Sequence, residues 1–294
     1  MKIKPIIRNK ILEYKHFAQR PLWNTIWADH VKFLWYDTKN WGDALNPILI
    51  EKISGIHARG FDIALRNSQT IHEDHDAELY YLVIGSTLKH ADAQTSIWGA
   101  GFASEFSQFR QKPKSIHAVR GPLSRKRINS LGVDCPAIYG DPALLYPRFY
   151  HPGLNPKYKL GIIPHYLDYR SPILKKFRND SNVLILDIKA GIEKFVQNLC
   201  SCQHLVSSSL HGLIMADAYG IPSKWIRLSD RLPGTGLKFQ DYYASIGCLD
   251  VDSFQFHEDV STQQLYDLCK IHKITLNLDD LLSACPFRDC KLKA

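Results

Sequence analysis

The sequence lacks any apolar run close to the roughly 20 residues that a transmembrane helix needs. Its longest apolar stretches, YYLVIG and VLILDI, have the length of buried strands. It also lacks internal repeats and low-complexity segments, which argues against solenoid and disordered chains. We therefore expect a globular protein that is soluble or peripheral to a membrane.

Paired cysteines are also missing. The seven cysteines are an odd number, form no C-x-x-C pair and follow no signal-peptide pattern, so we expect free thiols in a reducing cytosol. Cys200, Cys202 and His204 form a C-x-C-x-H spacing that matches no common zinc site. The run HEDHD (72–76) is typical of a solvated loop. We expect neither a metal nor a cofactor.

The positive charge is concentrated at the start of the chain. Residues 1–20 carry six lysines and arginines against one acid, Glu13, and so hold five of the eight net charges. Such a basic amphipathic segment lies on an anionic membrane surface or packs on the protein body. Nucleic-acid binding is not expected, because no aromatic–basic platform is visible. Apolar residues recur beside these charges at helical spacing: Ile3, Ile7, Ile11 and Tyr14.

From about residue 29 the chain alternates apolar runs with helix-like stretches. A segment rich in proline and glycine, YPRFYHPGLNPKYK (146–159), interrupts the alternation and reads as a linker. Strand–helix alternation predicts parallel sheets, so we expect two Rossmann-like, doubly wound α/β domains, 1–150 and 151–294, facing a cleft. Strands are predicted in 31–38, 78–86, 95–102, 114–121, 159–166, 183–188, 204–209 and 223–229, helices in 43–55, 122–132, 171–180, 192–202 and 211–220, and a helical tail from Thr262.

Residues that follow the predicted strands of the first half are candidates for ligand contacts, because ligands bind at the carboxyl ends of such strands. Asn40, Trp41, Gly42 and Asp43 lie on a loop that opens a helix. Asp43 either binds a hydroxylated ligand or stabilises the helix, as acidic side chains in the first turn do. Arg120 at another strand end suits a carboxylate or phosphate, and a surface salt bridge is the alternative.

The second half places histidines at two strand ends. His165 ends one strand, and His211 follows three serines at a helix start, where the helix dipole keeps it neutral as a general base requires. Ser209 is placed to cap that helix, whose start also attracts phosphate. Arg227 and Lys238 follow the next strand. Together these residues favour an anion-binding transferase.

Several blocks together resemble the polysaccharide pyruvyltransferases, which include bacterial ketal pyruvate transferases of exopolysaccharide synthesis. They are NWGDALNP, IWGAGF, VRGPLSRKRINSLGVDCPAIYGDPALL, GIIPHYLDY, VSSSLHGLIMADAYGIP and KFQDYYASIG, in the family's order from about residue 35 to 247. The resemblance implies a fold similar to B-type glycosyltransferases and phosphoenolpyruvate as the donor. It also implies a pyruvate ketal on a sugar, with release of phosphate. The implied acceptor is often a lipid-linked oligosaccharide at the cytoplasmic membrane face, so we expect a cytoplasmic location, peripheral on the inner membrane face.

One position departs from the family. Many members read Ser-x-Arg-x-His, whereas this chain has Ser207, Ser209 and His211, so a serine replaces the arginine taken to bind the donor. We expect Arg120, then Lys238 and Arg227, to supply the missing charge. The predicted site comprises catalytic His211, Asp43 and His165, donor-binding Arg120, Ser209, Gly212, Lys238 and Arg227, and acceptor-binding Asn40, Trp41 and Gly42.

Two other functions fit the same shape. A glycosyltransferase with a nucleotide-sugar donor would need an acid for the ribose and an aromatic ring for the base, and Glu193 and Trp225 are the candidates. A non-catalytic sugar- or phosphate-binding module would keep the glycine loops yet tolerate loss of His211. Fold alone does not separate these functions.

Overall fold

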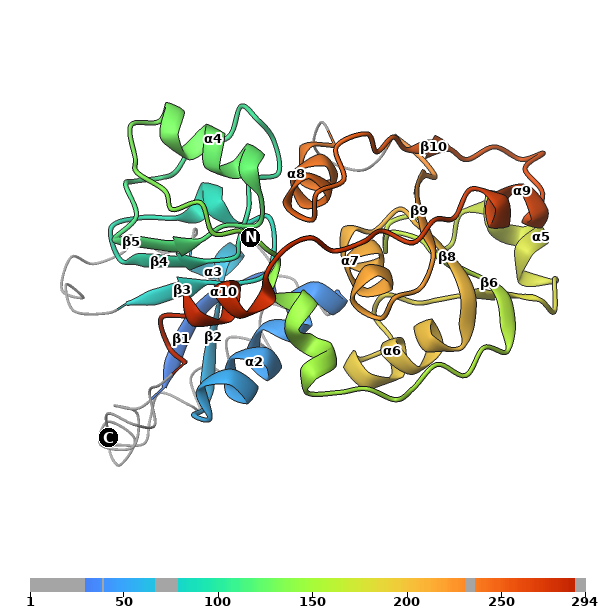
Figure 1. Ribbon diagram of the computed structural model, residues 1–294, viewed down its shortest axis with the longest axis horizontal. Helices are drawn as coiled ribbons and strands as arrows, with labels where there is room; N and C mark the ends of the chain where they lie inside the picture. The colour runs from blue at the N-terminus through green and yellow to red at the C-terminus, as the bar shows by residue number, and fades with distance from the viewer. Residues whose placement is uncertain (1–29, 39, 67–78, 231–235, 289–294) are drawn as a thin grey trace, which may run out of the picture. The chain divides into compact units, whose positions relative to one another are not determined.

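The computed structural model describes residues 30–38, 40–66, 79–230 and 236–288. From Val31 onward the chain forms one compact unit that contains two β-sheets (Figure 1). The basic segment 1–20, the HEDHD run and residues 231–235 lie outside the described residues. No helix in the described ranges is long and apolar enough to cross a bilayer.

The first sheet has five parallel strands in the order β2-β1-β3-β4-β5. Its main helices are α2 (Trp41–Ser54) and α4 (Pro122–Ser130). The short helix α3 (Ile63–Arg66) follows strand β2. Pro122 starts α4, where its missing N–H costs nothing. The strands are β1 (Val31–Trp35), β2 (Ala58–Asp62), β3 (Tyr80–Leu82), β4 (Thr95–Trp98) and β5 (Ser115–Ala118).

The second sheet repeats this arrangement, with parallel strands in the order β10-β9-β8-β6-β7. In each sheet the first strand along the chain lies between the second and the third, which is a doubly wound order. The expected α/β fold with two parallel sheets is thus confirmed, while similarity to B-type glycosyltransferases stays a prediction. The strands are β6 (Tyr158–Ile163), β7 (Val183–Ile185), β8 (Cys202–Ser207), β9 (Ser223–Arg227) and β10 (Phe254–Gln255), and the helices are α5 (Lys175–Arg178), α6 (Ile192–Cys200), α7 (Leu210–Ala218), α8 (Leu237–Ser245), α9 (Thr262–Asp267) and α10 (Leu278–Ser283).

Two edge strands, β2 and β10, were not predicted from the sequence. β2 reads ARGFD and has no buried residue, while β10 has only two residues. An edge strand has a neighbouring strand on one side only, so fewer of its side chains are buried. Its sequence therefore carries little of the apolar signal that marks a central strand.

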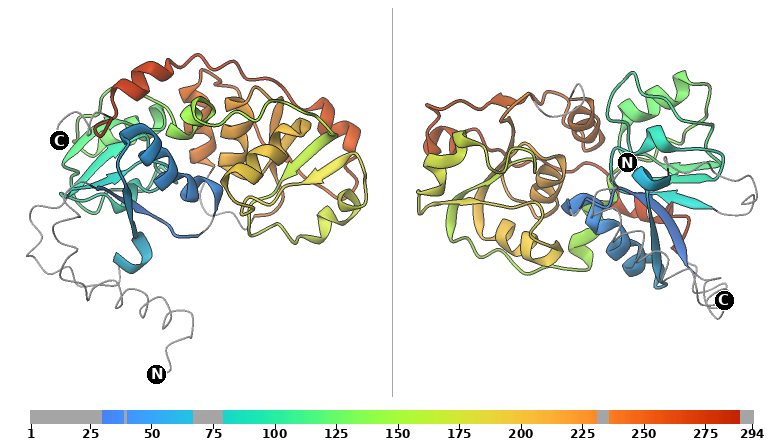
Figure 2. Two further views of the ribbon diagram at one scale, coloured as in Figure 1. Left: turned by 90° about the horizontal axis from the view of Figure 1, so that it is seen from below. Right: turned by 180° about the vertical axis from the view of Figure 1, so that it is seen from behind.

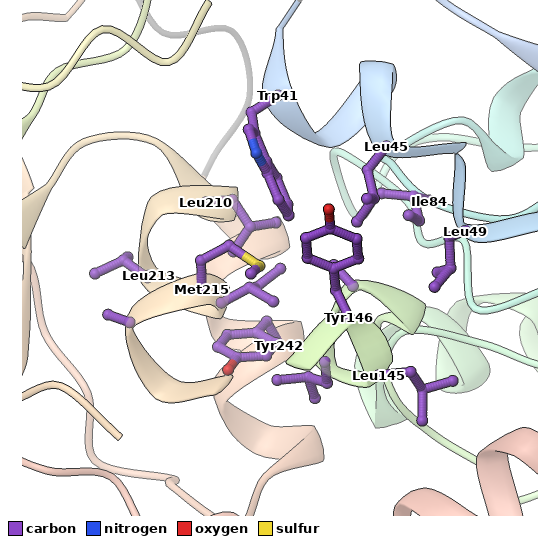
Figure 3. Close-up of a cluster of buried hydrophobic side chains, with 14 of the residues drawn as sticks. Trp41, Leu45, Leu49, Ile84, Leu145, Tyr146, Leu210, Leu213, Met215 and Tyr242 are labelled. Atoms are coloured by element: carbon purple, nitrogen blue, oxygen red, sulfur yellow. The ribbon is translucent and has the colours of Figure 1, made fainter. Parts of the chain in front are cut away.

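A shared hydrophobic cluster joins the elements of both sheets. Tyr146, in the 3₁₀ helix η3 (Pro142–Arg148), lies between side chains of α2 such as Leu45 and side chains of α7 such as Leu210 (Figure 3). The ring of Tyr146 is 2% exposed, so the start of the predicted linker belongs to the core. The continuous exposed run of that linker is residues 151–157.

The C-terminal segment returns to the first sheet. The indole N–H of Trp98 in β4 donates to the Leu281 carbonyl of α10 over 2.8 Å. The Phe287 ring lies 5.4 Å from that of Trp98 and 5.1 Å from that of Tyr81. Figure 2 shows α10 beside the first sheet. The division into domains at residue 150 stays a prediction.

Candidate functional site

The strand order of each sheet marks where a ligand would bind. In doubly wound sheets, ligands lie at the carboxyl ends of the strands where the order reverses. These strands are β1 and β3 in the first sheet and β6 and β8 in the second. They are followed by residues 40–43, 85–87, 164–165 and 208–211, so most of the predicted catalytic residues stand at these two switch points.

His211 and Gly42, predicted separately in the two halves, lie against each other. His211 is in the first turn of α7 and is 7% exposed. A Cβ atom placed on Gly42 would lie only 2.0 Å from His211 Nδ1. The start of α2 is held there by two hydrogen bonds of Trp41, from its backbone N–H to Ile188 O (3.0 Å) and from its indole N–H to Ile192 O (3.1 Å). Glycine is therefore needed at position 42 for this approach.

A further carboxylate, in the GDPALL block, faces the same imidazole. Asp141 is fully buried, and its Oδ1 accepts the backbone N–H of Ala143 over 3.0 Å. Its Oδ2 lies 3.8 Å from His211 Nε2, and neither atom has a hydrogen-bond partner among the described residues. The signal that could have identified Asp141 is its place at a strand end within the GDPALL block.

Lys238, at the start of α8, belongs to a cluster with His211, His165 and Asp43, and its charge affects the pKa of each of these three residues. Burial, and secondarily Arg120, lowers the pKa of Lys238 to about 8, while Asp43 opposes the shift. Its charge also helps to lower the pKa of His211 to about 3 and that of His165 to about 4, although burial is the larger cause for both. Both histidines are therefore neutral at pH 7. For His211, the predicted neutral state thus arises mainly from burial.

Asp43 is the acid of the cluster. Burial raises its pKa to about 6, against the lowering effects of hydrogen bonds from Thr38 and Asn40 and of the Lys238 charge. The Thr38 hydroxyl donates to Asp43 Oδ2 over 2.8 Å. A carboxyl group with this pKa exchanges a proton near neutral pH, as acid–base chemistry requires. The side chains of Asp43, Lys238 and His211 therefore form one electrostatically coupled group.

Arg120 is placed differently from the prediction. It is fully buried, and its Nε lies 3.1 Å and its Nη2 2.9 Å from Oδ2 of Asp241 in α8. The guanidinium also donates to Ser86 Oγ (2.8 Å) and to the Phe102 carbonyl (2.6 Å). The alternative for Arg120 was a salt bridge at the surface, whereas this one is fully buried, and it leaves few donors for a ligand. Direct donor binding by Arg120 stays a prediction.

Glycines of two sequence blocks make room for this ion pair. A Cβ on Gly101 would lie 2.4 Å from Arg120 Cζ, and one on Gly121 would lie 2.0 Å from the Asp241 backbone oxygen. Gly101 of the IWGAGF block thus allows close approach of a buried side chain of the protein itself.

Two further predicted residues have packing roles. Trp41 is 1% exposed, and its ring lies 5.9 Å from that of Tyr146 and 5.6 Å from that of Phe195. Gly212 packs so closely that an added Cβ would lie 2.4 Å from Ser207 Oγ. Because both residues are used inside the protein, we leave Trp41 out of the acceptor site and Gly212 out of the donor site.

Ser209 and Arg227 do not extend the cluster as predicted. Ser209 occupies the N-cap position of α7, but its side chain forms no cap hydrogen bond. Ser207 instead accepts the Ser209 backbone N–H over 3.0 Å. Arg227 is half-exposed and pairs with Asp230 over 2.9 Å at the surface. Their predicted roles in donor binding stay predictions.

The described residues contain no group of three or more histidine, cysteine, aspartate or glutamate side chains that could hold a metal ion. Cys200 and Cys202 are buried as free thiols, and burial raises their pKa to about 11 and about 12. The ring of His204 lies 3.8 Å from that of Tyr266.

The sequence matches a known protein family. A family model described as polysaccharide pyruvyl transferase matches residues 2–230. The chain belongs to the polysaccharide pyruvyl transferase family. The family resemblance noted from the motifs is thereby confirmed, and the chain is assigned to a transferase family. The matched range covers His211 and Asp141 but ends before Lys238 and Asp241.

Two curated proteins are similar to this polysaccharide pyruvyl transferase family member. The uncharacterized protein L143 of Acanthamoeba polyphaga mimivirus is 29% identical over 247 residues, which cover 82% of this chain and 78% of L143. The succinoglycan biosynthesis protein ExoV of Rhizobium meliloti (strain 1021) is 25% identical over 154 residues, or 51% of this chain and 46% of ExoV. The printed name of ExoV places that relative in exopolysaccharide biosynthesis.

Proposed function

We propose that this protein transfers the pyruvate unit of phosphoenolpyruvate to two hydroxyls of a sugar in a polysaccharide repeat unit. The products are a cyclic pyruvate ketal and inorganic phosphate. Membership of the family supports pyruvyl transfer. The observation that carries the proposal is the coupled group of Lys238, His211 and Asp43 at the switch points of the two sheets.

The donor is an anion with a carboxylate and a phosphate, and it needs buried cations or N–H groups. No side chain among the described residues forms an ion pair with the Lys238 ammonium, so Lys238 is our first candidate for a direct contact. Arg120 adds positive potential without a direct contact to the donor, since its charge lowers the pKa of His211 and of Lys238. These two cations compensate for the family arginine that Ser209 replaces. The first turn of α7 offers further N–H groups to a phosphate.

The reaction has a proton balance that the cluster can provide. C3 of phosphoenolpyruvate takes up a proton, and the oxygen of one sugar hydroxyl bonds to C2. A second hydroxyl oxygen then bonds to C2, and the bond to phosphate breaks. The two hydroxyls lose two protons, of which one replaces the proton delivered to C3 and the other leaves with phosphate or solvent.

The pKa directions suggest which residue performs each step. His211 is neutral at pH 7 and serves as the base for a hydroxyl. Asp43, with a pKa of about 6, is the group best able to deliver a proton to C3. Neutral His165 and Asn40 orient the acceptor diol from the two switch points. These roles require the bound donor to lie between α2 and α7.

The acceptor and location form the less direct part of the proposal. We propose a lipid-linked oligosaccharide or polysaccharide acceptor at the inner face of the cell membrane. The support is the excess of positive charge in residues 1–20, which would favour an anionic surface. That segment lies outside the described residues.

The rival functions have less support. A glycosyltransferase would need Trp225 to stack on a nucleobase, but Trp225 is 7% exposed and already stacks on Phe239 with ring centroids 4.4 Å apart. Glu193, the candidate ribose ligand, lies exposed on α6. A binding module without catalysis would not need a neutral buried histidine beside an acid with a pKa near 6.

The test uses phosphoenolpyruvate labelled with ¹³C at C2, incubated with lipid-linked oligosaccharide and polysaccharide fractions. We expect equal amounts of inorganic phosphate and of a ketal carbon in the ¹³C spectrum, and we expect both to be lost in His211→Ala. Consumption of a nucleotide sugar, with phosphoenolpyruvate unchanged in every mixture, would contradict the proposal.

A further inference from the structure

Two buried polar atoms face each other without partners beside the proposed donor site. Asp141 Oδ2 and His211 Nε2 are 3.8 Å apart, and neither forms a hydrogen bond with any described residue. Unpaired buried polar atoms are costly, and native proteins seldom keep two in one place without a function. The distance is slightly longer than a hydrogen bond, as is common for catalytic pairs in unliganded proteins.

The surroundings of Asp141 hold its carboxylate in a fixed orientation. Oδ1 is used in capping η3 through the Ala143 N–H, which leaves Oδ2 directed at the imidazole. Burial raises the pKa of Asp141 to about 6 and Arg120 opposes this shift, so the group is a carboxylate above pH 7. An ionised carboxylate only accepts hydrogen bonds, so it favours the histidine tautomer with the proton on Nε2.

The opposite nitrogen of the ring lies on the side of α2. Nδ1 is the His211 atom nearest to the position that a Gly42 Cβ would occupy, next to Asp43 in sequence. With the proton on Nε2, the lone pair of the imidazole is on Nδ1. Because Gly42 has no Cβ, the imidazole ring itself fills that space, and Nδ1 lies against the start of α2.

We infer that Asp141 is a positioning residue for His211, which holds the imidazole with its proton on Nε2 and its basic nitrogen Nδ1 toward the start of α2. This inference deepens the proposed function and rests on it for the role of His211. When Nδ1 takes a hydroxyl proton, the Asp141 carboxylate stabilises the imidazolium, as in carboxylate–histidine pairs of hydrolases. The proton moves from substrate to Nδ1 and does not pass to Asp141.

Asp141→Asn tests this inference with little change of shape. The amide oxygen still accepts the Ala143 N–H, while the amide nitrogen replaces Oδ2 and donates toward Nε2, which forces the proton to Nδ1. We expect kcat to fall by about 10²-fold or more, while the dissociation constant for phosphoenolpyruvate changes by less than about threefold. Asp168→Asn is the matched control, because Asp168 is also buried with an unpartnered Oδ2 but has no contact with His211.

The deciding readout is the tautomer of His211 in ¹⁵N-histidine spectra of the protein alone at pH 8, assigned by comparison with His211→Gln. We expect Nε2–H in the wild type and in Asp168→Asn, and Nδ1–H in Asp141→Asn. Nδ1–H in the wild type, or the same tautomer in the wild type and Asp141→Asn, would overturn the inference. The wild-type spectrum decides this even if the variant does not fold. A tautomer switch in a protein that binds no phosphoenolpyruvate would keep the Asp141–His211 pair and refute only the proposed function.

Discussion

Two cations, one fully buried and one partly buried, stand close to His211, and their surroundings differ. Arg120, at the end of β5, is fully buried and is paired with Asp241, Ser86 and Phe102. Lys238, at the start of α8, has no ion-pair partner among the described residues, and burial lowers its pKa to about 8. A strand-end arginine can thus be committed to the structure, while a less conspicuous lysine is available for an anion.

The largest expected effect is on the chemistry beside these cations. His211→Ala should lower kcat by about 10²-fold or more, because a general base is lost, while the fold is retained. Steady-state kinetics and circular dichroism measure the two quantities. His57→Ala is the control, since the His57 side chain is 82% exposed. Turnover near the wild-type value in His211→Ala would remove His211 from the mechanism.

The next prediction concerns stability and separates the two cations. Asp241→Asn leaves Arg120 buried without its counter-charge and should lower the free energy of unfolding by about 3–5 kcal/mol in urea denaturation. Lys238→Ala breaks no ion pair with a described residue and should change it by less than about 1 kcal/mol. The surface pair gives a control, because Asp230→Asn beside Arg227 should cost about 1 kcal/mol or less. Equal losses of unfolding free energy in Asp241→Asn and Lys238→Ala would mean that Arg120 and Lys238 do not differ in their structural roles.

A smaller effect is expected where α2 meets α7. Gly42→Ala places a Cβ about where His211 Nδ1 lies, so the ring must move, and kcat should fall about tenfold or more. Gly191→Ala, at an exposed helix start with no atom within 4 Å of the added Cβ, serves as a control for backbone strain alone. Gly191→Ala should keep its kcat. An unchanged kcat in Gly42→Ala would mean that the contact with His211 is not needed for catalysis.

The smallest effect is the pH dependence of donor binding. Deprotonation of Lys238 above its pKa of about 8 removes the cation, so affinity for phosphoenolpyruvate should fall as pH rises, by about tenfold from pH 7 to 9. In Lys238→Arg the charge persists, and calorimetry should show a flat profile over this range. Lys224→Arg, at a residue paired with Asp252, should keep the wild-type slope. The same slope in Lys238→Arg would assign the titration to another group.

Much of this account was predictable from sequence, and the rest depends on contacts that no sequence pattern encodes. The central strands, the helices after them and the strand-end positions of Asp43, His165 and His211 follow from apolar runs and turn residues. The pairing of Arg120 with Asp241 joins residues 121 positions apart, so a strand-end arginine alone could not reveal it. Trp41 has the aromatic side chain expected of a sugar-binding residue, yet its position in the fold buries it.

We propose that Lys238 and His211 form a site for phosphoenolpyruvate, and a calorimetric titration without acceptor decides whether they do. Wild type, Lys238→Ala and Lys224→Ala are each titrated with phosphoenolpyruvate, UDP-sugars and CMP-sialic acid. The account predicts saturable binding of phosphoenolpyruvate alone, lost in Lys238→Ala and kept in Lys224→Ala. Binding of a nucleotide sugar in place of phosphoenolpyruvate, or phosphoenolpyruvate affinity unchanged in Lys238→Ala, would contradict it.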